Sequence, residues 1–233
     1  MQCWKGPMPS PDIRSIEDMW PVLANHSCRE TGPLYYMYRN LAATPEDRTW
    51  LSNHSLRYDI TVISSRTLCG EYAKTKGHYH PAAPSGHSYP ELYQVLEGKA
   101  HYLLQMRDLS DVILVHAGEG DFVLIPTSYG HVTINPGSTD LIMANMVSSA
   151  FTSEYQDYVQ LRGGAYYEMS DGRIIRNPAY NHVPPLRSFD AKDIRNRLGF
   201  PCSGLYDLVG GGNLSFLNFP ERHPEMFRVY QGD

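Results

Sequence analysis

The feature that most limits the fold of this chain is a block of short β-rich segments from residue 91 to residue 147. Six such segments follow at short intervals: ELYQVL, KAHYLLQM, DVILVH, DFVLIP, HVTIN and DLIMANMV. Turn-forming residues separate them, among them Gly98, Gly120 and the pair Pro136-Gly137, and almost no helical period interrupts the run. Evenly spaced short strands predict an antiparallel sandwich or barrel.

The elements outside this block are less regular. We expect strands at 34–38 and 58–64, a polar loop at 44–55, an edge hairpin at 166–180, a helix at 189–198 and an extended tail at 210–233. A chain of 233 residues with 42% hydrophobic residues can bury one good core. The sequence therefore predicts an all-β domain at 34–180, with an N-terminal extension (1–33) and a C-terminal extension (181–233).

Composition excludes several functional classes. A net charge of −5 argues against nucleic acid or an anionic membrane surface as a partner. No apolar run approaches the ~20 residues of a membrane span, and the N-terminus lacks a signal-peptide pattern. The scattered cysteines, Cys3, Cys28, Cys69 and Cys202, predict neither a disulfide framework nor a thiolate zinc site. A reducing, cytoplasmic location is the simplest interpretation.

Two histidines at strand spacing begin a candidate metal site. Side chains alternate along a strand, so His78 and His80 face the same way. Glu91 opens the next strand, and His131 follows in a later hairpin. Three imidazoles and one carboxylate can hold a divalent ion and leave positions open for substrate. His87 is a rival ligand, but it lies in a Pro/Gly/Ser-rich loop that holds it poorly.

These residues match the two sequence motifs of the cupin family. His78, His80, Glu91 and Gly98 fit the first motif, with a longer gap between the second histidine and the glutamate than is usual. The second motif is fitted by Gly120, Pro126, His131 and Asn135, with Ser128 where a glycine is common. The resemblance implies a double-stranded β-helix, or jelly-roll barrel, with a bound metal. It says little about the reaction, because one fold hosts many chemistries.

A narrower resemblance concerns roughly residues 14–180. The runs GEYAKTKGHYH and ELYQVLEGKA look like the cupin-type glucose-6-phosphate isomerases. That resemblance implies metal ligands at His78, His80, Glu91 and His131. It also implies substrate contacts, mainly to phosphate, at Thr61, Thr75, Gly77, Tyr36 and Tyr155. Lys76 or Arg39 would add charge. Two departures, Val147 for a usual tyrosine and Ser153 for a usual histidine, put the exact substrate in question.

The implied reaction interconverts glucose 6-phosphate and fructose 6-phosphate through a metal-chelated cis-enediolate. Glu91 is the candidate base, and Tyr93, two residues further along the strand, should line the cavity beside the metal. We expect one ion per subunit, Fe²⁺ from the resemblance, with Mn²⁺, Ni²⁺, Co²⁺ and Zn²⁺ as alternatives. The expected assembly is a homodimer. The competing hypotheses are a metal-dependent cupin dioxygenase and a non-catalytic sugar-phosphate-binding cupin.

Overall fold

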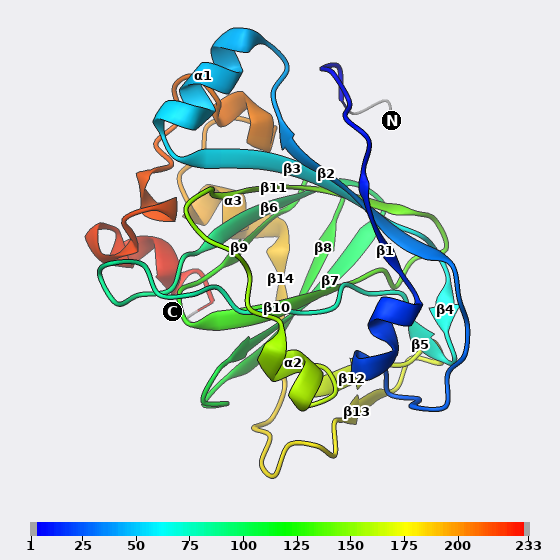
Figure 1. Ribbon diagram of the computed structural model, residues 1–233. Helices are drawn as coiled ribbons and strands as arrows, with labels where there is room; N and C mark the ends of the chain where they lie inside the picture. Colours follow the sequence, from blue (N-terminus) through cyan, green and yellow to red (C-terminus); the bar gives the residue numbers. More distant parts are fainter. Residues whose placement is uncertain (1–3, 231–233) are drawn as a thin grey trace.

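The computed structural model describes residues 4–230, which form two β-sheets around a shared core (Figure 1). The larger sheet has the order β1-β2-β3-β11-β6-β9, made of Asp12–Ser15, Pro33–Leu41, Leu56–Ile63, Leu141–Ser148, Glu91–Glu97 and Phe122–Ile125. The smaller sheet has the order β10-β7-β8-β14, made of Tyr129–Ile134, Lys99–Met106, Val112–Gly118 and Arg187–Asp190. Two ribbons complete the strands: β4 (Thr67–Leu68) with β5 (Glu71–Tyr72), and β12 (Tyr166–Glu168) with β13 (Ile174–Arg176).

Strands that are far apart in sequence pair at the centre of the larger sheet. β11 lies between β3 and β6, so Val147 has Arg57 opposite it on one side and Glu91 on the other. In the smaller sheet, β7 pairs with both β8 and β10. Side chains such as Leu92 and Phe122 are fully buried in the core. The predicted strands between 91 and 147, the hairpin within 166–180 and the all-β class are confirmed.

The prediction of a polar loop at 44–55 was wrong, because Pro45–Asn53 form helix α1. Thr44 caps the helix by accepting a hydrogen bond from the Asp47 backbone N–H at 3.1 Å. Pro45 fits the first turn, where no N–H is needed, and Leu51 anchors the helix to the core. These start signals are local, and a mostly polar helix surface concealed them.

The cysteines predicted not to build a disulfide framework do form one disulfide. Cys28 and Cys69 are bonded, with Cα atoms 5.7 Å apart and a sequence separation of 41. The N-terminal segment reaches Cys69 because it runs along the turn between β4 and β5, where the Glu71 carboxylate accepts from the Ala24 N–H at 3.0 Å. Sequence spacing does not reveal such a tertiary approach. Cys202 is unpaired, and Cys3 lies outside the described residues.

The C-terminal extension packs against the barrel. The helix predicted at 189–198 is divided, because β14 continues to Asp190 and pairs in parallel with β8, which delays α3 to Ile194–Arg197. The tail is a series of short turns, and Tyr230 donates to the Leu124 carbonyl at 2.7 Å. The remaining helical elements are α2 (Gln156–Gln160) and 3₁₀ turns at Glu17–Val22, Ala191–Asp193, Leu205–Leu208, Ser215–Leu217, Pro220–Arg222 and Pro224–Arg228. Among residues 4–230, no helix combines the length and apolar character that crossing a membrane requires.

Candidate metal centre

His78 and His80 lie on an extended segment that pairs with β10. The His78 N–H donates to the His131 carbonyl at 3.2 Å, and the His131 N–H donates back at 3.0 Å. This bridge places the first and third predicted histidines side by side. Side chains alternate in extended backbone, so Tyr79 points the other way, where its hydroxyl accepts from Gln105 Nε2 at 2.8 Å.

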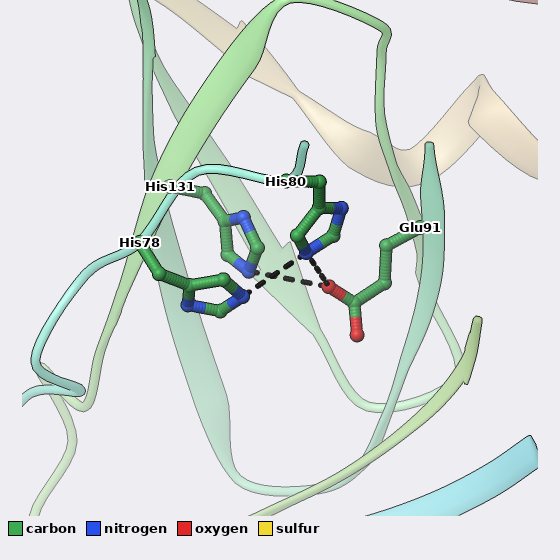
Figure 2. A group of neighbouring side chains, drawn as sticks. All are labelled: His78, His80, Glu91 and His131. Atoms are coloured by element: carbon green, nitrogen blue, oxygen red, sulfur yellow. Dashed lines mark hydrogen bonds and ion pairs between the residues drawn. The ribbon is translucent and has the colours of Figure 1, made fainter. Parts of the chain in front are cut away.

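Glu91, at the start of β6, brings a carboxylate to these imidazoles. One ligand atom from each of the four side chains lies within 4.8 Å of the other three (Figure 2). The Nε2 atoms of His78 and His80 are 3.1 Å apart. Glu91 Oε2 is 3.3 Å from His80 Nε2 and 3.5 Å from His131 Nε2. His87 stays on an exposed loop and does not join this cluster.

The pKa shifts of His78, His131 and Glu91 favour the protonation states that metal ligands need. Burial, with repulsion from the neighbouring imidazoles, lowers the pKa of His78 well below its usual value. Burial also lowers the pKa of His131 to about 4, although Glu91 opposes the shift. Burial alone would raise the pKa of Glu91, but its interactions with the neighbouring imidazoles of His80 and His131 bring it below its usual value. At neutral pH these two imidazoles are neutral and the carboxylate is ionised, as metal binding requires.

The cluster fits a divalent cation. Separations of 3.1, 3.3 and 3.5 Å are what ligands about 2.1 Å from one shared ion would show. Glu91 Oε2 is buried without a hydrogen-bond partner, and a cation would satisfy it. His80 Nδ1 bonds the Tyr89 carbonyl at 2.8 Å; a carbonyl only accepts, so Nδ1 carries the hydrogen and Nε2 presents its lone pair to the centre. Four such ligands leave two positions on an octahedral ion.

A narrow cavity leads to this cluster. Its volume is about 50 Å³, room for roughly one or two water molecules. Besides the four clustered side chains, the cavity is lined by Tyr35, Met37, Arg39, Arg57, Thr61, Thr75, Lys76, Tyr93, Met143, Asn145, Val147, Ser153 and Tyr155.

Three of the five predicted substrate contacts, Thr61, Thr75 and Tyr155, are in this lining, and so is Tyr93, which was predicted to lie beside the metal. The Tyr93 hydroxyl lies 3.0 Å from His131 Nε2, directly beside the candidate ligands. Thr75 Oγ1 accepts from the Thr133 N–H at 2.9 Å, and this bond fixes the hydroxyl in the wall. Val147 and Ser153, the two departures from the family pattern, also face the cavity.

Two predicted residues, Tyr36 and Gly77, are not among the residues that line the cavity. Tyr35 lines it instead of Tyr36, because side chains alternate along β2 and Tyr36 lies on the other face. Gly77 offers no side chain to the lining. Its φ is +81°, and an added Cβ would stand 2.5 Å from Tyr158 Cδ1 and 2.8 Å from Val132 Cγ2. Packing alone therefore demands glycine there.

Sequence reasoning missed Arg57. The signal was available, because Arg57, Asp59 and Thr61 alternate along β3 and Thr61 was already predicted to face the cavity. Asp59 is fully buried and lies 2.9 Å from Arg57 Nε and 3.0 Å from Arg39 Nη1. Arg39, predicted only as an added charge near phosphate, is thus joined to Arg57 through one carboxylate.

Two sheets enclosing three imidazoles and one carboxylate define a cupin. A family model described as glucose-6-phosphate isomerase matches residues 14–185, and the chain belongs to this family. It is 25% identical over 177 residues to a glucose-6-phosphate isomerase of Thermococcus gammatolerans, covering 72% of this chain and 87% of that protein. The corresponding Thermococcus onnurineus protein is 24% identical over 159 residues, with coverages of 67% and 77%. A solved cupin 2 conserved barrel domain protein from Rhodopseudomonas palustris has a TM-score of 0.35 at 17% identity, covering 51% of this chain and 63% of that one.

Proposed function

We propose that this protein is a metal-dependent aldose–ketose isomerase that interconverts glucose 6-phosphate and fructose 6-phosphate. Family membership supports the reaction. The observation that carries the proposal is the convergence of His78, His80, Glu91 and His131 at a cavity whose wall also bears hydrogen-bonding side chains for a phosphorylated sugar.

The chain's own residues account for substrate positioning and proton transfer. Thr61, Thr75 and Lys76 bind the phosphate, and that binding energy orients the sugar. Glu91 removes the proton from C2, the C–H electron pair forms the C1–C2 double bond, and the carbonyl pair moves to O1. Glu91 then returns the proton to C1, while the O2 hydroxyl proton passes to O1 as the carbonyl moves to C2. A bound divalent ion supplies Lewis-acid stabilisation of the two oxygens.

The identity of the ion and the assembly belong to the same proposal. We propose Fe²⁺ as the native ion, because imidazole and carboxylate ligands suit it and the family resemblance favours it. We propose a homodimer of subunits, each with one catalytic barrel at 34–180 and extensions at 1–33 and 181–233. Neither nucleic acid nor membrane is a proposed partner.

A cytoplasmic location follows from a sugar-phosphate substrate. There the Cys28–Cys69 disulfide would meet a reducing environment. Counting free thiols in protein purified from its own cells tests this location. Two more free thiols than expected for protein with an intact disulfide would show that Cys28 and Cys69 are reduced.

Two alternative functions share the metal site. A cupin dioxygenase would consume oxygen on an aromatic or acireductone substrate, and isomerisation without oxygen argues against it. A non-catalytic sugar-phosphate-binding cupin is suggested by Val147 and Ser153, which offer fewer polar groups than the family pattern. Such a protein would bind the sugar phosphate without turning it over.

The deciding experiment measures formation of glucose 6-phosphate from fructose 6-phosphate, with and without chelator. We expect activity that chelator removes and that ferrous or manganous ion restores. Metal-loaded protein that binds fructose 6-phosphate without converting it would refute the isomerase and favour the binding protein.

A further inference from the structure

Two arginines that line the cavity share one buried carboxylate. Asp59 Oδ2 lies 3.0 Å from Arg39 Nη1 and 2.9 Å from Arg57 Nε. Asp59 Oδ1 already accepts from the Asn40 N–H at 2.8 Å. Asp12 lies 3.7 Å from Arg39 but is 72% exposed, so it offsets little charge. Two guanidinium groups against one carboxylate leave a surplus positive charge facing the cavity.

Strand register places Arg57 at the metal end of the cavity. Arg57 is opposite Val147, and Val147 is opposite Glu91, so the three form one row across adjacent strands. At a strand spacing of about 4.8 Å, the Arg57 and Glu91 backbones are about 10 Å apart. Val147 is short and has no polar side-chain atom. Arg57 is therefore the next polar side chain to Glu91 along that row.

The proposed phosphate contacts, Thr61 and Thr75, lie further along the strands than the metal ligands do. Thr61 is four residues from Arg57 on β3, which corresponds to about 13 Å along the strand. In the opposite wall, the Thr75 N–H donates to the Thr133 carbonyl, two residues along β10 from His131. Both threonines are thus displaced along their strands from the metal ligands. An extended sugar phosphate can span the two levels, with C1 and C2 beside Glu91.

Asp59 does not need Arg57 as a partner to satisfy its buried carboxylate. Asp59 is paired with Arg39 and bonded to the Asn40 N–H without it. Arg57 uses only Nε on Asp59, and its Nη1 and Nη2 have no hydrogen-bond partner within residues 4–230. An arginine held by Nε in this way keeps its two terminal donors free for a ligand.

We propose that Arg57 is a catalytic residue that donates hydrogen bonds to the substrate oxygens at C1 and C2, where negative charge develops. This inference rests on the proposed isomerase function. Arg57 transfers no proton; it stabilises the anion while Glu91 carries the proton from C2 to C1. Asp59 and Arg39 are positioning residues that hold the guanidinium and preserve its surplus charge.

The test compares Arg57→Met with Arg57→Lys in the full-length protein loaded with manganous ion. Arg173→Met, on an exposed hairpin arginine, is the matched control. We expect Arg57→Met to lower kcat by about 100-fold, the loss typical of removing one oxyanion donor, with KM unchanged. Metal content should equal that of wild type, and Arg57→Lys should recover part of kcat because it restores a charged donor.

Binding provides a second readout that does not depend on turnover. The probes are a five-carbon sugar phosphate ending in a hydroxamate, which mimics the enediolate in its ionised form, and the corresponding neutral alcohol. Arg57→Met should lower the affinity for the hydroxamate, relative to the affinity for the alcohol, by about the same 100-fold. The reason is that affinity for such an analogue follows transition-state stabilisation.

A structural role would give a different pattern. If Arg57 serves only to neutralise Asp59, the double variant Arg57→Met/Asp59→Asn recovers activity, and this recovery overturns the proposal. Wild-type kcat in Arg57→Met with an unchanged affinity ratio overturns it as well and leaves the isomerase function intact. Wild-type protein that never isomerises the sugar phosphate refutes the proposed function itself, and the catalytic role with it.

Discussion

Replacing Glu91 by glutamine is the most direct test of the proposed chemistry. Glu91 is 3% exposed, and it is the single carboxylate among the cavity-lining residues in the described part of the chain. No second carboxylate in this lining can therefore take over as base. General-base catalysis contributes about 10²- to 10⁴-fold, which corresponds to about 3–5 kcal/mol of barrier. The absence of a second carboxylate favours the upper part of that range.

The assay follows fructose 6-phosphate conversion by Glu91→Gln protein saturated with manganous ion, alongside metal content by atomic absorption. The three imidazoles remain, so the variant should still bind metal at high metal concentration. Glu97→Gln, at the exposed end of the same strand, is the control and should keep full activity. More than a few per cent of wild-type turnover with metal bound would refute the base role. Solvent deuterium in the wild-type product would show proton transfer rather than a hydride shift.

The remaining predictions concern binding and stability. Thr75→Ala should raise KM for fructose 6-phosphate about 10- to 100-fold, because it removes a hydrogen bond to a charged phosphate, and it should leave metal content unchanged. A normal KM together with loss of metal would contradict this. Replacing both Cys28 and Cys69 by serine should lower the free energy of unfolding by about 4 kcal/mol, given the 41-residue separation; denaturant titration checks it, and equal stability refutes it. The hydrogen bond from Arg187 lowers the pKa of Asp111; burial opposes this shift and the hydrogen bond from Tyr129 adds to it. Because the pKa is lower in the folded state, the ionised carboxylate stabilises the fold at pH values above its unfolded-state pKa. This stabilisation is lost as the pH falls through the folded-state pKa. Asp111→Asn should therefore cost about 1 kcal/mol at pH 7 and nothing in strong acid; a pH-independent difference would contradict this.

The sequence was informative wherever one local rule governed structure. Alternation along strands predicted that His78 and His80 would share a face, and it also placed Tyr93 in the cavity. In β2 the cavity is lined by Tyr35 and not by the predicted Tyr36, because a shift of one residue reverses the face and nothing local fixes the register. Helix α1 has local start signals at Thr44 and Pro45, but its mostly polar surface lacks the apolar period that marks a helix in sequence.

What the sequence alone determined is the β-rich class and the shared face of His78 and His80, because both depend on spacing within short segments; the two-motif resemblance added Glu91 and His131. Only the tertiary structure decided which distant groups meet. The Cys28–Cys69 disulfide and the row from Arg57 through Val147 to Glu91 depend on how separate segments pack and pair. Pairing between strands is set by the burial of the whole core, and no single stretch of sequence contains that information.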